Sequence, residues 1–201
     1  MDFLLSSVLA QVCLGVGLAQ LAGLRAFLPV ALLGLFSAHG LFGAPELAGT
    51  WFAFLELPWV WIALFAMALV ELTLDKLPAV YQAQDLLFTP LRVAAGAAAF
   101  GAALAAQPAV VVIVGMVAGA ALAAIAHFAK GALYINRQAS DGTASAFLSL
   151  FLDLVVAAGA VAVLLFPLLG ILFLLFLLYF VYRVRKTKRR KKYKGLRLLR
   201  E

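Results

Sequence analysis

The chain has 201 residues, of which 66% are hydrophobic and 12% are charged. A soluble domain of this size is about 45–50% apolar and about 25% charged, so this chain carries more apolar surface than one soluble core can bury. The composition excludes a soluble enzyme and a disordered chain, and the single cysteine, Cys13, excludes a disulfide framework. We expect an all-α, polytopic transmembrane helix bundle of about six or seven spans.

The charge divides the chain into two parts. Eleven of its 16 basic residues lie between Arg183 and Arg200, whereas residues 1–182 hold five basic and eight acidic residues. We therefore expect a transmembrane bundle over 1–182 and a basic cytoplasmic tail over 183–201, because a short basic segment beside a span is the usual orientation signal. Six tail residues are expected to contact anionic lipid headgroups: Arg183, Arg185, Lys186, Lys188, Arg189 and Arg190. No nucleic-acid partner is expected.

The first apolar run, residues 3–38, is too long for one straight span. Its 36 residues would form a helix of about 54 Å. Gly23, Arg25 and Pro29 lie near its middle, and proline disfavours a continuous helix, so the run is expected to break there. It forms either two spans, the second short, which places the N-terminus outside, or one span plus a re-entrant half-helix, which places it inside.

Five further spans follow at 58–75, 91–106, 109–136, 144–165 and 171–183. The segment 39–57 and the tight turns at 107–108 and 166–170 are expected outside, and the connectors 76–90 and 137–143 inside. Each outside connector lacks Lys and Arg, whereas each inside one contains a basic residue, so the positive-inside rule agrees with the tail. We expect a multi-pass protein of the inner (plasma) membrane with a cytoplasmic C-terminus.

Small residues dominate two neighbouring spans, at 94–106 and 115–124. Such residues let helix backbones approach closely within lipid, so these spans should form a tight antiparallel hairpin. The last span is rich in Leu and Phe and is expected at the periphery, facing lipid.

Several polar side chains interrupt the apolar segments, although an ionisable group costs at least about 2.5–3.5 kcal/mol at the centre of a span. Helical spacing places Glu71 with Asp75 on one face, and Ser149 with Asp153 on another. We expect a polar cavity that opens to the cytoplasm and is lined by Arg25, Glu71, Asp75, His127, Lys130 and Asp153. The alternative is that these charges only fix the helix register, with His127 a hydrogen-bonded core histidine and Asp85–Arg92 an interfacial pair.

No motif indicates an enzyme class. The sequence has no P-loop, no GxGxxG and no GxSxG, and its two histidines, His39 and His127, are far apart. We therefore expect no cofactor, no metal site and no enzymatic activity. Acid–base chemistry on lipid by an acid, a histidine and a lysine in one cavity is a third alternative.

Three sequence runs carry a family resemblance. The runs GLRAFLP (23–29), ELTLDKLP (71–78) and HFAK (127–130), with Ser149 and Asp153, resemble a family of small bacterial integral membrane proteins known as domain of unknown function 4126. The resemblance extends from about residue 15 to 182 and implies a shared helical membrane fold without an assigned activity. A basic residue in each half, followed by an acid in a later span, also indicates a weak internal repeat.

Two functions compete. The first is a small transporter or channel-like protein that binds an anionic or zwitterionic solute through Arg25 and Lys130. The second is a non-catalytic scaffold or lipid-binding protein whose basic tail engages anionic lipid or a partner. Membrane lipids and a small solute or ion are the expected partners, and the oligomeric state is left open.

Overall fold

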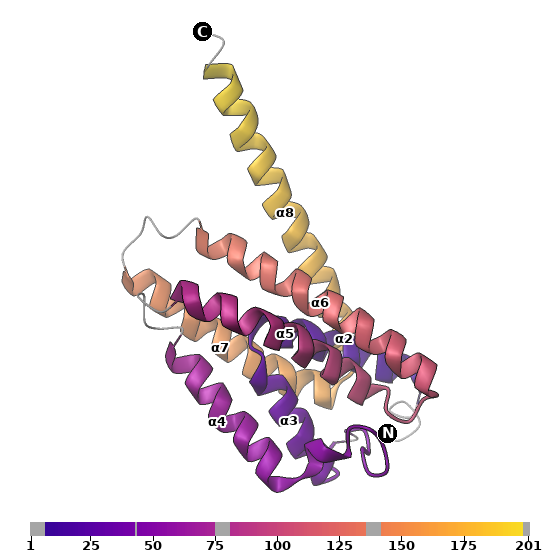
Figure 1. Cartoon of the computed structure of the whole chain (residues 1–201). Helices are drawn as coiled ribbons and strands as arrows, with labels where there is room; N and C mark the ends of the chain where they lie inside the picture. The colour runs from indigo at the N-terminus through magenta and orange to yellow at the C-terminus, as the bar shows by residue number, and fades with distance from the viewer. Residues whose placement is uncertain (1–6, 43, 75–80, 136–141, 199–201) are drawn as a thin grey trace.

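The computed structural model describes residues 7–42, 44–74, 81–135 and 142–198. Over these ranges the chain is all-helical, with seven α-helices, one short 3-10 helix and no strand, which confirms the expected helical bundle (Figure 1). The elements are α2 (Val8–Leu24), α3 (Phe27–Ala38), η1 (Ala53–Glu56), α4 (Pro58–Leu74), α5 (Tyr81–Ala103), α6 (Ala109–Ile135), α7 (Gly142–Leu165) and α8 (Leu169–Leu198).

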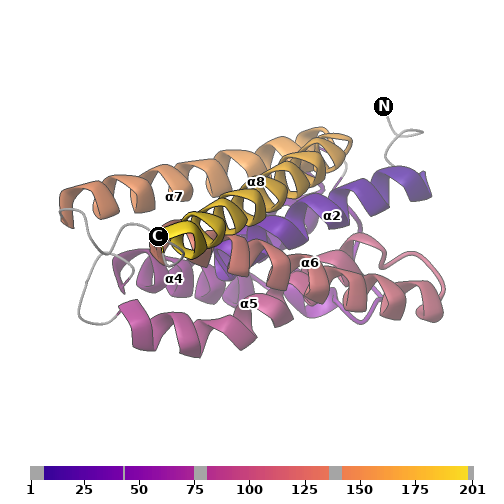
Figure 2. The same ribbon diagram turned by 90° about the horizontal axis from the view of Figure 1, so that it is seen from above.

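The helices alternate in direction between two ends of the bundle. The start of α2, the α5–α6 turn and the α7–α8 turn lie at one end, and the first turns of α5 and α7 lie at the other (Figures 1 and 2). At the first end, Gln107 Nε2 donates a hydrogen bond of 2.9 Å to Gln11 Oε1. We call this end, which contains Gln11 and Gln107, the turn end.

The first apolar run breaks where the sequence predicts. Helix α2 ends at Leu24 and α3 begins at Phe27, because the backbone of Arg25 is extended, with φ −140° and ψ 115°. The loop after α3 lies at the turn end, where Thr50 shares a cavity with Gln107. The two helices therefore run in opposite directions, and the 12 residues of α3 cover only about 18 Å.

Helix α5 begins earlier than expected. The sequence predicted a connector over 76–90 and a span starting at residue 91, whereas α5 runs from Tyr81 to Ala103 with Pro90 inside it. A proline removes one backbone donor, and a helix packed among neighbours tolerates this loss. That expectation was wrong because Pro90 was taken as a helix boundary.

The α5–α6 hairpin packs as tightly as its small residues predict. A Cβ atom added to Gly119 would overlap the carbonyl oxygen of Gly96, and one added to Gly96 would overlap the Cβ of Ala123. Helix α2 joins this packing, because a Cβ on Gly23 would overlap the Ala123 carbonyl oxygen. Three helix backbones are thus in direct contact around α6.

The surface is apolar while the centre holds charge. Trp59, Leu69, Val117, Phe128, Leu154 and Phe176 are each 64–68% exposed, as are many other large apolar side chains, whereas the exposed fractions of Arg25, Arg92 and Glu71 are at most 1%. By length and composition alone, one described helix is long and apolar enough to cross a membrane, at residues 109–131, and the other apolar helices are shorter. The described fold is compatible with a membrane protein.

Candidate functional site

The break between α2 and α3 leaves backbone groups without helical partners. The carbonyl oxygen of Leu24, at the end of α2, accepts a hydrogen bond of 3.4 Å from Lys130 Nζ on α6. The amide of Ala26, at the start of α3, donates a hydrogen bond of 3.0 Å to Glu71 Oε2 on α4. A cation therefore lies at the carbonyl end of one helix and an anion at the amide end of the next, as the helix dipoles favour.

The side chain of Arg25, the residue at the break, is held by α7. Its Nε donates to Asp153 Oδ1 at 2.7 Å, its Nη2 forms an ion pair with the same oxygen, and Nη2 also donates to Ser149 Oγ at 3.0 Å. Ser149 and Asp153 thus share the helix face that their spacing predicted.

A second ion pair lies on the other side of the break. Glu71 Oε1 accepts hydrogen bonds from Arg92 Nη2 at 3.1 Å and Nε at 3.3 Å. Arg92 Nη1 lies 3.1 Å from His127 Nδ1, and His127 Nε2 lies 2.9 Å from Thr89 Oγ1. Because a guanidinium can only donate, Nδ1 must accept, so the imidazole is neutral and Nε2 donates to Thr89.

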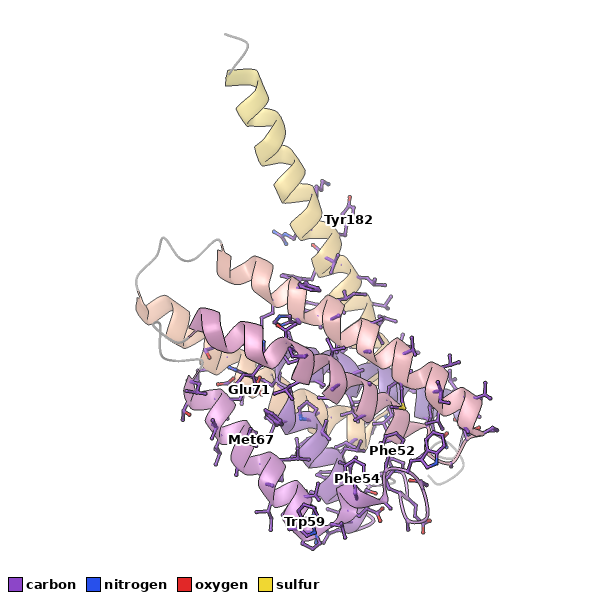
Figure 3. The ribbon with its side chains drawn as sticks, in the orientation of Figure 1. Phe52, Phe54, Trp59, Met67, Glu71 and Tyr182 are labelled. Carbon is purple, nitrogen blue, oxygen red and sulfur yellow. The ribbon has the colours of Figure 1, made fainter. Side chains whose placement is uncertain are left out.

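These groups form one buried layer, which we call the break cluster: Arg25, Glu71, Arg92, His127, Lys130, Ser149 and Asp153. Their exposed fractions range from 0% for Arg92 to 9% for Asp153. Figure 3 shows Glu71 on the side of α4 that faces the rest of the bundle. Measured along their helices, Glu71, Arg92 and Asp153 lie about 16–20 Å from the turn end. In a hydrocarbon core about 30 Å thick, the cluster would lie in the half farther from that end.

The part of the chain that matches a known family model includes every residue of the break cluster. The family model described as domain of unknown function (DUF4126) matches residues 12–187. The chain belongs to this family. No curated protein and no solved structure matches the chain. The resemblance carried by the three sequence runs is thereby confirmed, and family membership assigns no activity to the DUF4126 chain.

The structure brings together five of the six residues expected to line a cavity. Arg25, Glu71, His127, Lys130 and Asp153 surround the break, whereas Asp75 lies outside the described residues. In this conformation they contact one another and the broken backbone. A cavity of about 210 Å³ lies instead at the turn end, between residues 49–52 and the α5–α6 turn.

Arg92 is the member that sequence reasoning missed. Starting the span at residue 91 places Arg92 at a membrane edge, whereas a helix from Tyr81 to Ala103 places it near the middle. The sequence signal that could have found it is the run 81–89, which contains no glycine or proline and therefore continues the helix outward.

The tail residues of the DUF4126 chain are described only in part. Arg183 and Lys186 are exposed, and Lys186 Nζ lies 5.7 Å from the centroid of the Tyr182 ring. Side chains of Arg185, Lys188, Arg189 and Arg190 lie outside the described part. Among the described residues, no group of three His, Cys, Asp or Glu is placed to hold a metal ion.

Proposed function

We propose that this DUF4126 protein is a small transporter or channel-like protein of the plasma membrane, which binds an anionic or zwitterionic solute at the break cluster. One observation carries the proposal: Glu71 lies on the open amide end of α3, and Lys130 lies on the open carbonyl end of α2. Discontinuous helices with such ends recur at the solute sites of secondary transporters.

Membrane placement is supported by the distribution of polarity. Large apolar side chains face outward on α4, α6, α7 and α8, while the charged side chains of the break cluster are buried. This is the arrangement that lipid favours, because charges within a bilayer face the interior of a bundle. Helix α8 runs from the turn end into the basic segment, so the positive-inside rule supports a multi-pass topology with a cytoplasmic C-terminus.

The chemistry of the break matches a solute with a negative group. The amide end of α3 and the guanidinium of Arg92 both favour a carboxylate or phosphate, and Glu71 now occupies that position. The carbonyl oxygen of Leu24 favours a cation, and the ammonium group of Lys130 now occupies that position. We regard the two side chains as internal occupants that a solute displaces, since it offers the same charges to the same backbone groups.

The break is also a boundary between two groups of helices. Helix α3 packs mainly on α4, whereas α2 packs mainly on α5, α6 and α8. Movement of the α3–α4 pair relative to the other group would separate Glu71 from Arg92 and open the cluster to solute. This route assigns binding and gating roles to the cluster, and it needs neither a catalytic residue nor a cofactor.

The test is solute flux in proteoliposomes, with inorganic phosphate, acetate and glycine betaine as probes. We expect at least one probe to give flux above protein-free liposomes. Glu71→Gln and Lys130→Gln should each reduce this flux about tenfold, a factor that corresponds to roughly 1.4 kcal/mol, because a cluster without one of its internal occupants no longer closes after the solute has left. Glu56→Gln is the matched control, because Glu56 is a carboxylate near the turn end that bonds Ser37 and Leu47. Circular dichroism checks that each variant is folded.

Flux absent for all three probes would overturn the proposal, and so would unchanged flux in both cluster variants. Flux lost equally in Glu56→Gln would also contradict it, because that variant leaves the cluster intact.

A second function, a lipid-binding or partner-binding scaffold, is favoured by the long basic end of α8. Truncation after Tyr182 separates the two functions. The transport proposal expects flux to persist in the truncated chain, whereas a scaffold expects no flux in either chain and loss of lipid or partner binding on truncation.

A further inference from the structure

The end of α8 is a helix in which most residues are basic. We call residues 183–198 the basic extension; it holds ten Lys or Arg residues and no acid. The helix continues into it from the apolar part of α8 without interruption, and at 1.5 Å per residue the extension is about 24 Å long. Figure 1 shows it projecting away from the bundle.

This composition opposes helix formation in water. Lys186 and Arg190, Lys188 and Lys192, and Arg190 and Lys194 are each four residues apart, so like charges lie on successive turns. At 100° per residue, the ten basic positions fall on every side of the helix. The extension therefore lacks the apolar face with which an amphipathic helix lies flat on a bilayer.

The counter-charge has to come from outside the extension. It contains no acidic partner, and the contacts of α8 with the bundle include the packing of Leu177 and its neighbours in the apolar part against Ala126 and Ala129 of α6. A helix that repels itself along its length is stabilised when a dense layer of negative charge surrounds it.

We propose that the anionic headgroups of the leaflet from which α8 emerges stabilise the basic extension as a helix. The extension begins directly after Tyr179 and Tyr182, which are 57% and 60% exposed, and exposed tyrosines are typical of the membrane–water interface. Its first turn therefore starts at headgroup level, where lipid phosphates are concentrated and each nearby Lys or Arg is attracted. The proposal rests on the proposed membrane placement and is independent of transport.

The test is hydrogen exchange of the full chain in two kinds of nanodisc. One is made of phosphatidylcholine alone, and the other also contains anionic phosphatidylglycerol. We expect amides 184–198 to exchange about tenfold more slowly in the anionic discs, because a stable helix protects its amides. High salt should remove this protection, since it screens exposed charges. Equal exchange in both discs would overturn the proposal.

A charge-pairing variant provides the matched control. Lys186→Glu with Lys188→Glu places an acid four residues before Arg190 and before Lys192, an orientation that stabilises helices. This variant should be protected in phosphatidylcholine discs without anionic lipid. Exchange as fast as in the unaltered chain would contradict the argument from self-repulsion.

Two further arms separate this proposal from others. Amides 171–181 should be protected in both discs, and their rapid exchange would indicate that α8 does not insert, which is a failure of the membrane placement. Adding polyuridylate or polyglutamate to phosphatidylcholine discs tests other polyanions. Protection by these, with none from phosphatidylglycerol, would overturn the lipid assignment.

Discussion

The α5–α6 interface and the α2–α3 break are two neighbouring regions that are stabilised by opposite means. At the interface, Gly96 and Gly119 remove side chains so that backbones touch, and dispersion forces hold the helices together. At the break, Glu71, Lys130 and Arg25 supply charged side chains to backbone groups and to one another. Close packing needs no buried charge, whereas an interrupted helix in an apolar bundle needs polar partners.

The largest effect is expected from removing one partner at the break. Asp153→Ala removes the carboxylate that pairs with the buried guanidinium of Arg25, and breaking a buried ion pair in this way costs about 3–5 kcal/mol. The free energy of unfolding, measured in mixed micelles with increasing SDS, checks this. The double variant Arg25→Met with Asp153→Leu should cost less than Asp153→Ala, and a greater cost would contradict the assignment.

Glu71→Gln tests the other side of the break at a smaller scale. The Ala26 amide and Arg92 are both donors to Glu71, so the amide nitrogen of glutamine would face a donor in place of one carboxylate oxygen, while its own oxygen retains one contact. We expect a loss of about 1.5–3 kcal/mol in the same unfolding experiment. A variant as stable as the unaltered chain would show that the two hydrogen bonds contribute nothing.

The interface is tested by adding volume. Gly119→Val places methyl groups against the Gly96 backbone, which cannot move without separating α5 from α6, and overpacking of this kind costs about 1–3 kcal/mol. Gly131→Ala on the same helix is the control, because nothing lies within 4 Å of its added Cβ. The control should gain about 0.5–1 kcal/mol from better helix propensity.

The smallest effect is expected on the outer face of α8. Phe176 is 66% exposed, so Phe176→Leu exchanges one apolar side chain for another at the surface. Its free energy of unfolding should change by less than about 0.5 kcal/mol. A loss comparable to that of Gly119→Val would mean that this face is packed against another protein surface.

Much of the fold was predictable because apolar length and Gly/Pro position act locally. The break near Arg25, the turn at 107–108 and the start of α4 at Pro58 all follow from such signals. The partners within the break cluster were not predictable, because periodicity gives the face of a helix but not its neighbour. Glu71, for example, accepts a hydrogen bond from the backbone amide of Ala26, and the side-chain types of these two residues do not predict this contact.

The wrongly predicted start of α5 also led to a wrong prediction for Arg92. A boundary assigned at Pro90 moved Arg92 from the middle of α5 to its edge, and its ion pair with Glu71 was therefore not considered. The internal repeat and the division at residue 182 stay predictions, since neither is tested by the arrangement of the helices.

The reversal of the chain at Arg25 involves the extended backbone of a single residue. Rotating its φ and ψ into the helical region would fuse Val8–Ala38 into one straight rod of about 46 Å, which would carry α3 and its loop out of the bundle. A change in these two torsions would therefore change the angle between α2 and α3. A spectroscopic distance between probes at residues 9 and 37 would report that change.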